Sequence, residues 1–169
     1  MCGIIGYTGY SDARGVLIKG LKTLEYRGYD SAGIALYNKN KNEADVIKCK
    51  GRVALLDEKT KDATGTCGIG HTRWATHGSV SDENSHPHKF GSVTLVHNGI
   101  IENFNSIKNQ LGVESMLKSD TDSEIFAALI NAYYQKDKNP EKAIIKAVKE
   151  ITGTFALGIM FDGIENTIY

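Results

Sequence analysis

The sequence predicts an α+β fold in which sheets and helices are stacked in layers. Two observations support this prediction. Short apolar strand patterns joined by polar segments fill most of the first hundred residues, and three helical patterns with their own start and stop signals follow them. The chain has 169 residues, 41% of them hydrophobic, which is enough to bury one sizeable core. We therefore expect a single domain.

The first expected elements are a strand and a helix. Residues 3–9 form a short apolar run, and Ser11 is a candidate N-cap for the segment behind it. Leu17, Leu21 and Leu24 then recur at helical spacing. This order predicts a strand followed directly by an amphipathic helix.

A hairpin comes next. Residues 32–37 and 44–50 are strand-like and are separated by a short polar run, so we expect them to pair in antiparallel fashion. A short helix is expected at 53–61. Residues 66–70 and 92–96 are apolar and predict two buried strands on either side of a polar loop.

Two helices with recognisable ends follow this loop. Residues 104–111 carry an apolar stripe, and Gly112 can end that helix. Thr121 and Glu124 fit the S/T-x-x-E capping box that opens a helix, and apolar residues within 125–132 share one of its faces.

The last part of the chain predicts a third helix and two strands. Asn139 and Pro140 suit the N-cap and first position of the helix, and Gly153 is the expected stop. Residues 154–161 are strand-like, and an Asp-Gly turn leads to residues 165–169, which we expect to begin another strand.

Charge and composition exclude several classes of function. The 20 Lys and Arg residues balance the 20 Asp and Glu residues, so no excess positive charge favours nucleic acid or a membrane surface as a partner. No apolar stretch approaches the roughly 20 residues that span a bilayer. Three cysteines are too few for a disulfide framework, and the start has no secretory signal pattern. We expect a cytoplasmic protein.

Cys2 is the strongest candidate for a reactive residue. Removal of Met1 would leave it with both a thiol and a free α-amine, a group that titrates near about 8 and can accept the thiol proton. The alternative is a small residue tolerated at a frayed terminus. The apolar strand directly behind Cys2 favours a fixed nucleophile. Cys49 and Cys67 lie in strand patterns and are interpreted as ordinary buried residues.

Six segments carry the most specific signal in the sequence. In chain order they are CGIIGYTG from residue 2, EYRGYDSAGIA at 25–35, HTRWATHG at 71–78, HPH at 86–88, VHNGIIEN at 96–103 and SDTDSE at 119–124. Together they resemble the glutaminase domain of the glucosamine-6-phosphate synthase family of class II glutamine amidotransferases. Other class II amidotransferases resemble the chain at the Cys start and the HNG block, but they usually differ at YRGYDSAG and TRWATHG.

The resemblance implies a fold and a domain organisation. The family's glutaminase domain is a four-layer αββα sandwich of the N-terminal-nucleophile hydrolase type. It normally continues with further strands, so we expect residues 1–169 to be one partial, C-terminally truncated glutaminase domain. The sugar-phosphate isomerase domains of the family would lie outside this chain.

The resemblance also implies a reaction. Cys2 would attack the side-chain amide of L-glutamine, and the Asn98 amide with the Gly99 N–H would hold the oxyanion, giving glutamate and ammonia. The parent enzyme would use the ammonia to convert fructose 6-phosphate to glucosamine 6-phosphate, with the sugar bound only by the missing C-terminal domains. No metal and no organic cofactor are implied, and the parent enzyme is expected to be a homo-oligomer.

Two residues would hold the amino-acid head of glutamine. Arg73 would bind its α-carboxylate, for which a planar guanidinium is well suited, and Asp122 would bind its ammonium. At two of these positions, a purely structural explanation competes with the functional one. The Asn98–Gly99 dipeptide by itself favours a type I′ hairpin turn, and an acid in the first turn of a helix is favoured by the helix dipole whatever its function.

Other residues would have closing and supporting roles. The resemblance assigns to substrate contact Trp74, Thr76, His77 and His86, and to support of the nucleophile Arg27 and Gly28. The polar neighbours of Trp74 favour a loop position over a core position. A turn that ends a helix explains Gly28 nearly as well as a role in the site does.

Three alternatives remain open beside the leading hypothesis. One is the glutaminase domain of another class II amidotransferase. A second is a metal-dependent hydrolase, suggested by five histidines, although the sequence has no HExxH motif. The candidate ligands are His86 and His88, with His71, His77 and His97 nearby in sequence. The third is a non-catalytic regulatory domain, which the intact set of candidate site residues argues against. Any chain that retains Met1 would be inert, because its α-amine at Cys2 is acylated.

Overall fold

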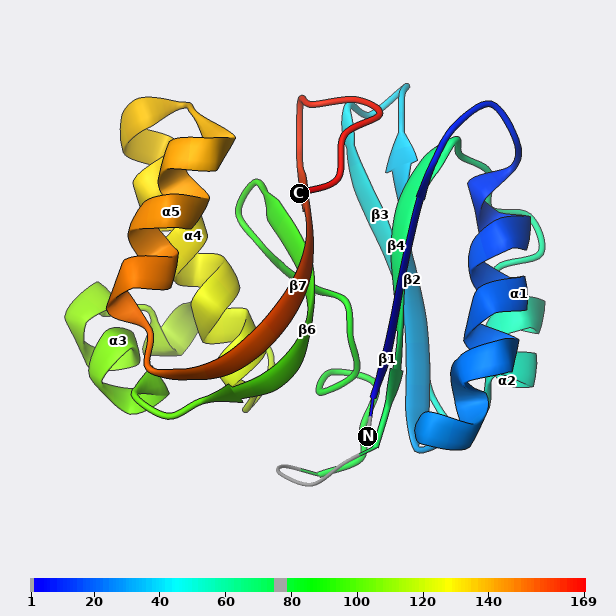
Figure 1. Ribbon diagram of the computed structural model, residues 1–169, viewed down its shortest axis with the longest axis horizontal. Coiled ribbons are helices and arrows are strands. Elements are labelled where there is room, and N and C mark those ends of the chain that lie inside the picture. The colour runs from blue at the N-terminus through cyan, green and yellow to red at the C-terminus, as the bar shows by residue number, and fades with distance from the viewer. Residues whose placement is uncertain (1, 75–78) are drawn as a thin grey trace.

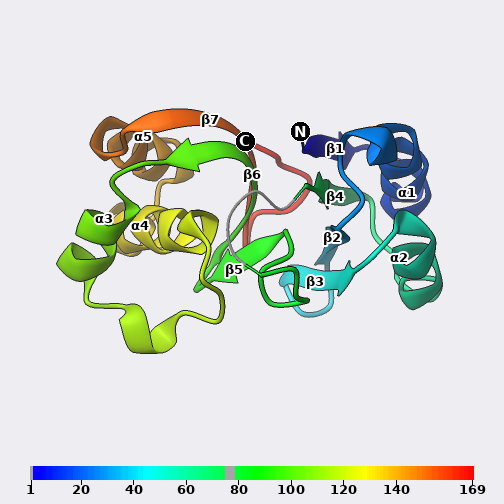
Figure 2. The ribbon, with the colours of Figure 1, turned by 90° about the horizontal axis from the view of Figure 1, so that it is seen from below.

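Two antiparallel sheets lie face to face in the computed structural model, which describes residues 2–74 and 79–169. Sheet A has the strand order β1-β4-β2-β3 and sheet B the order β5-β6-β7. Helices α1 and α2 cover the outer face of sheet A, and α3, α4 and α5 cover that of sheet B (Figure 1). The view from below shows the same succession of layers (Figure 2). The four-layer αββα arrangement is therefore confirmed.

Sheet A and its helices come from the first part of the chain. Its elements are β1 (Gly3–Thr8), α1 (Ala13–Leu24), β2 (Ser31–Asn38), β3 (Glu43–Lys50), α2 (Val53–Lys59) and β4 (Cys67–Arg73). The predicted hairpin is confirmed, since β2 and β3 pair in antiparallel register from Ser31–Lys50 to Asn38–Glu43. Apolar side chains of α1, such as Leu17 and Leu21, are fully buried against the sheet.

The N-cap of α1 is Asp12, so the prediction of Ser11 was wrong by one residue. The Asp12 carboxylate accepts hydrogen bonds from the N–H groups of Arg14 and Gly15. Ser11 instead donates its own N–H to the hydroxyl of Tyr7, 3.2 Å away. Both residue types cap helices well, and this contact with Tyr7 keeps Ser11 in the turn that precedes the helix.

Sheet B and its helices come from the second part of the chain. The elements are β5 (His88–Phe90), β6 (Val93–Ile101), α3 (Phe104–Leu111), α4 (Asp122–Asp137), α5 (Pro140–Glu150) and β7 (Gly153–Phe161). Short 3₁₀ turns lie at Glu25–Arg27 and Glu114–Met116. Within the described parts of the chain, none of the helices combines the length and the apolar composition needed to span a bilayer.

Only half of the predicted capping box forms at the start of α4. The Thr121 hydroxyl accepts from the N–H of Glu124 at 3.3 Å, as expected. The Glu124 carboxylate turns away and accepts from the N–H groups of Lys118 and Ser119 at 2.7–3.1 Å. Glu124 therefore holds the loop before the helix rather than the N-cap residue itself.

At the boundaries of α3 and α5, two predictions were correct and one was wrong. Gly112 is left-handed, with φ at 63°, and ends α3 as predicted. Asn139 caps α5 through its side chain, also as predicted. The helix, however, ends at Glu150, and Gly153 is the first residue of β7 instead of the helix stop. The extended backbone of Ile151 ends the helix earlier.

The segment after the Asp162–Gly163 turn is not a strand, so the strand expected over 165–169 was wrong. Tyr169 nevertheless exchanges both backbone hydrogen bonds with Ile159 of β7, at 2.9 and 3.0 Å. A single such pair is too short to continue the sheet.

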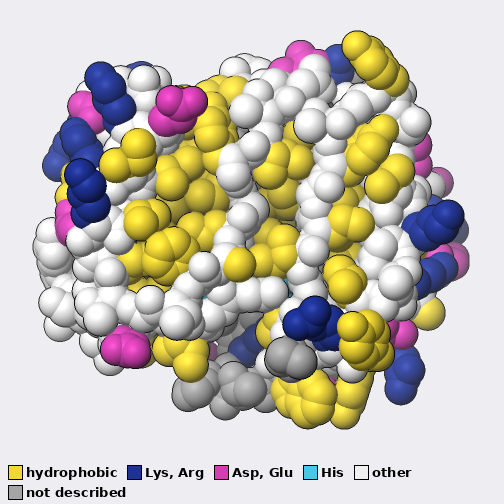
Figure 3. Space-filling view, in the orientation of Figure 1, with side chains coloured by type: hydrophobic (Ala, Val, Ile, Leu, Met, Phe, Trp, Pro, Cys, Tyr) yellow, Lys and Arg dark blue, Asp and Glu magenta, His cyan; other side chains and the backbone are white. Residues whose placement is uncertain are grey.

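The space between the two sheets is an apolar core that leads into a polar end. Ile69 of β4, Val96 of β6 and Met160 of β7 are fully buried there. Because side chains alternate along a strand, His71 and Arg73 lie on the same face of β4 as Ile69. Figure 3 shows apolar side chains gathered along the middle of the front face, with charged side chains over the helices at its edges.

Candidate active site

A cavity of about 170 Å³ opens between the sheets at the end where β1 begins. This volume is below the roughly 300–1,000 Å³ of sites for drug-sized ligands, so the cavity suits a small metabolite. It is lined by Cys2, Arg73, Trp74, His86, His97, Asn98, Gly99, Ile100, Ile101, Phe104, Asp120, Thr121, Asp122 and Ser123. These residues come from five separate segments of the chain.

Cys2 directly precedes β1 and is half-buried. Its Sγ lies 3.3 Å from the backbone N–H of Trp74, which follows the last residue of β4. The thiol is thus held beside the β4 terminus by the pairing of β1 with β4, which begins at Gly3 and Thr72. This pairing fixes the position of the candidate nucleophile.

Gly28 packs closely against the end of β4. A Cβ at this position would come within 2.8–3.0 Å of the peptide group that joins Arg73 to Trp74. Gly28 also donates its N–H to the carbonyl of Glu25, so the helix-ending turn and the close approach both exist. Arg27 is half-buried in the same turn and is not among the described residues that line the cavity.

Asn98 and Gly99 lie within β6, so the hairpin turn favoured by this dipeptide was wrong. They pair with Ala156 and Phe155 of β7. Gly99 has φ at 137°, and a Cβ there would overlap the carbonyl oxygen of Thr154. Glycine is therefore required by both backbone conformation and space. The Asn98 Nδ2 donates to the carbonyl oxygen of Cys2 at 3.2 Å, which joins the two sheets at the site.

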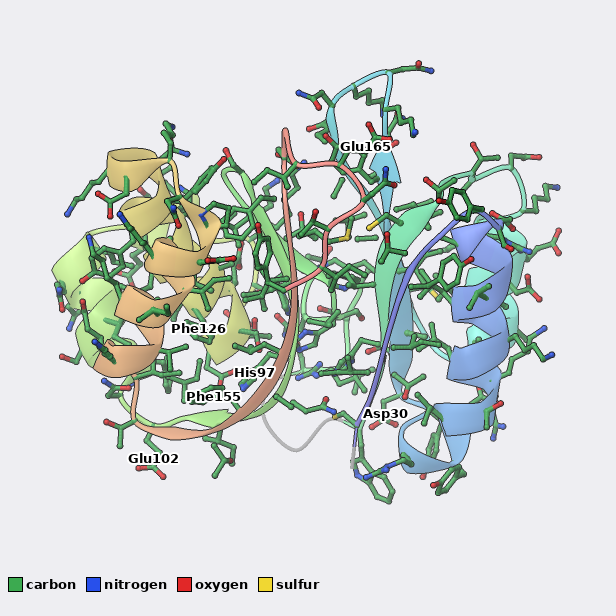
Figure 4. The ribbon with its side chains drawn as sticks, turned by 45° about the horizontal axis from the view of Figure 1, so that its top comes forward. Asp30, His97, Glu102, Phe126, Phe155 and Glu165 are labelled. Carbon is green, nitrogen blue, oxygen red and sulfur yellow. The ribbon has the colours of Figure 1, made fainter. Side chains whose placement is uncertain are left out.

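Arg73 and Asp122 place opposite charges at the same cavity. Arg73 is buried at the end of β4, where Nη1 donates to the Ser79 carbonyl at 3.2 Å. Burial lowers the pKa of its guanidinium, while electrostatic interactions with Cys2, Asp30 and Asp122 act in the opposite direction. Asp30 lies beside the end of β4, where its N–H donates to the Arg73 carbonyl (Figure 4).

Trp74 lies at the rim of the cavity, in the loop after β4, as its polar neighbours predicted. Its side chain is 45% exposed, which excludes the core position considered as an alternative. Its ring is tilted against that of Tyr29, with 5.7 Å between centroids. Thr76 and His77, proposed as neighbours of Trp74 in substrate contact, lie outside the described residues, as does Met1.

Four histidines, His71, His86, His88 and His97, are buried at or near the cavity, and two of them, His86 and His97, line it. The His86 ring stacks on His71 at 4.1 Å between centroids and meets His88 edge-on at 4.5 Å. Burial holds the pKa of His86 and His88 well below the usual range and lowers that of His71 to about 4. Burial also lowers the pKa of His97. All four rings are therefore neutral near pH 7.

The histidines have partners other than a metal. His88 Nε2 lies 3.1 Å from the Thr121 hydroxyl, and His97 Nδ1 lies 2.9 Å from that of Ser123. His86, expected to be a loop contact, accepts the N–H of His97 at 3.4 Å and also lines the cavity. Among residues 2–74 and 79–169, no group of three or more His, Cys, Asp or Glu side chains is arranged to hold a metal ion.

Several lining residues were missed from the sequence. Ser123 stands next to Asp122 in the SDTDSE segment and donates to its Oδ1 at 3.3 Å as well as facing His97. His97 was considered only as a possible metal ligand. Figure 4 shows it on the α4 side of sheet B, where Phe126 of α4 meets Phe155 of β7 with 6.3 Å between ring centroids. Side-chain alternation along β6 was the signal that could have placed it there.

Comparison with protein-family models gives one match. The model described as a glutamine amidotransferase domain matches residues 71–169. This segment includes most of the cavity lining, from Arg73 to Ser123.

Curated relatives match over the whole length of the chain. The glutamine--fructose-6-phosphate aminotransferase [isomerizing] of Staphylococcus epidermidis is 47% identical over 100% of this chain and 28% of its own length. The protein of the same name from Clostridium acetobutylicum is 47% identical over 95% of this chain and 26% of its own length. The chain thus spans little more than a quarter of the curated relatives that it matches.

Solved structures match the fold. The glutamine phosphoribosylpyrophosphate amidotransferase of B. subtilis, complexed with ADP and GMP, has a TM-score of 0.81 at 26% identity, over 96% of this chain and 35% of that one. A structure described as the allosteric regulatory enzyme of purine biosynthesis has a TM-score of 0.82 at 27% identity, over 96% of this chain and 36% of that one.

Proposed function

Because the chain belongs to the glutamine amidotransferase family, we propose that it hydrolyses L-glutamine to glutamate and ammonia with Cys2 as the nucleophile. One observation carries this proposal. A candidate nucleophile, two candidate oxyanion donors and two opposite charges line one small cavity, although they come from distant parts of the chain. They are Cys2, Asn98, Gly99, Arg73 and Asp122.

The charges at the cavity suit the head of an amino acid. The Arg73 guanidinium would bind the α-carboxylate in a fork, and the Asp122 carboxylate would bind the α-ammonium. Both groups lie on fixed elements, the end of β4 and the first turn of α4. Trp74 would cover the bound substrate at the rim and keep water away. We include Thr76, His77 and His86 among the substrate contacts and Arg27 with Gly28 as supporting residues, as the family resemblance implies.

The chemistry is an acyl transfer in two stages. With Met1 removed, the α-amine of Cys2 takes the thiol proton, and Sγ attacks the carbonyl carbon of the glutamine side chain. The carbon–nitrogen bond of the resulting tetrahedral intermediate then breaks, and the proton passes from the α-amine to the departing nitrogen, which leaves as ammonia. Water hydrolyses the thioester and releases glutamate. The Asn98 amide and the Gly99 N–H would stabilise the negative oxygen at both stages.

The role of the parent protein is a further part of the proposal. We propose that the 169 residues form the glutaminase domain of a longer cytoplasmic, homo-oligomeric protein. The names of the relatives at 46–47% identity support fructose 6-phosphate as the acceptor of the ammonia. The sugar phosphate would bind in sugar-isomerase domains encoded outside these residues.

Glutamate release from glutamine tests the proposal. Cys2→Ala should abolish turnover, whereas Cys49→Ala, at a cysteine buried under α2 and away from the cavity, should leave it near the wild-type rate. Undiminished hydrolysis by Cys2→Ala would refute the assignment of the nucleophile. For the full-length protein, glucosamine 6-phosphate should form from glutamine and fructose 6-phosphate. Formation of phosphoribosylamine from phosphoribosyl pyrophosphate instead would identify a different class II amidotransferase.

A further inference from the structure

The His71 side chain joins the two sheets next to Asn98, a residue that lines the cavity. His71 lies in β4, paired with Ile4 of β1 and Gly33 of β2, and its ring is buried on the face toward sheet B. Its Nε2 lies 3.2 Å from the carbonyl oxygen of His97 and 2.8 Å from Oδ1 of Asn98, both in β6. One ring nitrogen of sheet A therefore contacts two oxygens of sheet B.

The two contacts determine where the ring carries its proton. A backbone carbonyl can only accept a hydrogen bond, so Nε2 must be the protonated nitrogen that faces His97. The other nitrogen, Nδ1, is buried without a hydrogen-bond partner among the described residues. A second proton there would place a charge in the interior without compensation, in keeping with a pKa that burial lowers to about 4. The ring is a neutral donor at Nε2.

This donor determines the orientation of the Asn98 amide. In the observed orientation, Oδ1 of the Asn98 amide accepts the Nε2–H of His71. If the amide were rotated by 180°, its own N–H groups would face that donor instead. The observed orientation leaves Nδ2 on the side of Cys2, where it donates to the Cys2 carbonyl at 3.2 Å. An amide NH₂ has two protons, so one stays available for an oxygen that develops charge near the sulfur.

We propose that His71 is a positioning residue for the oxyanion site, which holds the Asn98 amide with Nδ2 toward Cys2 through the Nε2–H···Oδ1 hydrogen bond. This inference rests on the proposed glutaminase function. His71 is not among the described residues that line the cavity, so it acts through Asn98 and not on the substrate. The His71 ring stacks on the ring of His86, which restricts its rotation.

A pair of variants separates this role from a structural one. The amide nitrogen of Gln reaches about as far as Nε2, whereas that of Asn ends near Nδ1. His71→Asn should lower kcat about 10- to 100-fold, a part of the 100- to 1,000-fold loss typical for removal of an oxyanion donor, with KM changed less than about threefold. His71→Gln should retain most of kcat. In an Asn98→Ala background the two variants should have the same kcat, because there is no amide left to orient.

Three kinetic results would overturn the inference. The first is an equal kcat for folded His71→Asn and His71→Gln. The second is an effect of His71→Asn on KM alone, with kcat unchanged. The third is a difference in kcat between the two variants that persists in the Asn98→Ala background. A measurement that needs no turnover gives an independent decision. The ¹⁵N NMR shifts of the His71 ring in the wild-type protein should show protonated Nε2 and unprotonated Nδ1 from pH 7 to pH 5. A proton on Nδ1 would refute the proposed orientation even if the wild-type protein proved not to hydrolyse glutamine, a result that would refute the proposed function separately.

Discussion

The carboxylate of Asp122 accepts a hydrogen bond from the backbone N–H of Ile101, with 2.8 Å between Oδ2 and N. This contact joins the first turn of α4 to the last residue of β6, two residues beyond Gly99. Asp122 therefore has a structural partner besides its proposed ligand, the substrate ammonium. A substitution that removes its charge must be distinguished from one that also removes the acceptor for Ile101.

Asp122→Asn and Asp122→Ala make that distinction. Both remove the negative charge, so KM for glutamine should rise about 10- to 100-fold in each, the range expected for loss of a charged hydrogen bond. Only Asp122→Ala also leaves the Ile101 N–H without its acceptor, which should lower the free energy of unfolding by about 1–2 kcal/mol more than Asp122→Asn does. Steady-state kinetics and urea unfolding measure the two effects. An unchanged KM in Asp122→Asn would exclude the proposed ammonium contact.

Gly99→Ala should be strongly destabilising. The left-handed backbone at φ 137° strains any other residue, and the new Cβ would overlap the Thr154 carbonyl, so we expect a loss of about 2–4 kcal/mol with loss of turnover. Gly112→Ala is the matched control, since Gly112 also has positive φ but has open space around its Cβ position. Its cost should be about 1 kcal/mol with turnover retained. Equal losses of unfolding free energy would argue against the steric explanation.

The proposed base requires a free α-amine at Cys2. A protein carrying a cleavable N-terminal tag should hydrolyse glutamine at least about 100-fold more slowly before cleavage than after exposure of Cys2, in the range that general-base catalysis contributes. The same cleavage of a Cys2→Ala variant should give no increase. Mass spectrometry verifies each terminus. Full turnover by the uncleaved protein would refute the amine-base mechanism.

The buried histidines predict a loss of stability in mild acid. The unfolded chain protonates each ring near pH 6.5, but the folded chain does not, since burial lowers the pKa of His71 to about 4 and that of His86 and His88 far below their usual value. Below pH 6.5 the unfolded state therefore binds more protons, and the free energy of unfolding falls as pH decreases. At pH 5.5 the loss is about 1.4 kcal/mol for each such ring relative to pH 7.5.

Urea unfolding at pH 7.5 and 5.5 measures this loss. His71→Gln removes one titrating ring and should reduce the difference between the two pH values by about 1.4 kcal/mol. Carboxyl groups titrate at lower pH and contribute little in this window. Equal unfolding free energies at the two pH values would show that the rings are protonated in the folded protein.

The elements with complete local signals were predicted well. The side-chain cap at Asn139 and the left-handed end at Gly112 depend on residues within one turn of the helix, which a sequence shows directly. The hairpin turn predicted from the Asn98–Gly99 dipeptide was wrong because it, too, rested on a local signal alone. Its preference for a hairpin turn is local, whereas the observed strand comes from pairing of β6 with β7, far along the chain. The four-layer fold of the N-terminal-nucleophile type came from the resemblance and not from these local patterns.

The residues of the candidate site also divide into those that the sequence predicted and those that it did not. The resemblance nominated as site residues seven of those that line the cavity, namely Cys2, Arg73, Trp74, His86, Asn98, Gly99 and Asp122. Sequence reasoning took His71 and His97 only as possible metal ligands. Their actual contacts depend on how the layers pack, because the His71 bond to Asn98 crosses from sheet A to sheet B and the His97 bond to Ser123 joins β6 to α4. No spacing along a single strand reveals a partner on the opposite sheet.

Because the site is divided between two sheets, its turnover rate should depend strongly on how closely the two sheets pack. Cys2 is attached to sheet A and the Asn98–Gly99 pair to sheet B, and the fully buried Ile69, Val96 and Met160 separate the two. A smaller or larger side chain at these positions changes the spacing of the sheets, and with it the distance from sulfur to oxyanion donor. Conservative replacements there, such as Val96→Ala, should reduce kcat at temperatures where the protein is still fully folded. Selection for catalysis therefore constrains the size of side chains that never meet the substrate.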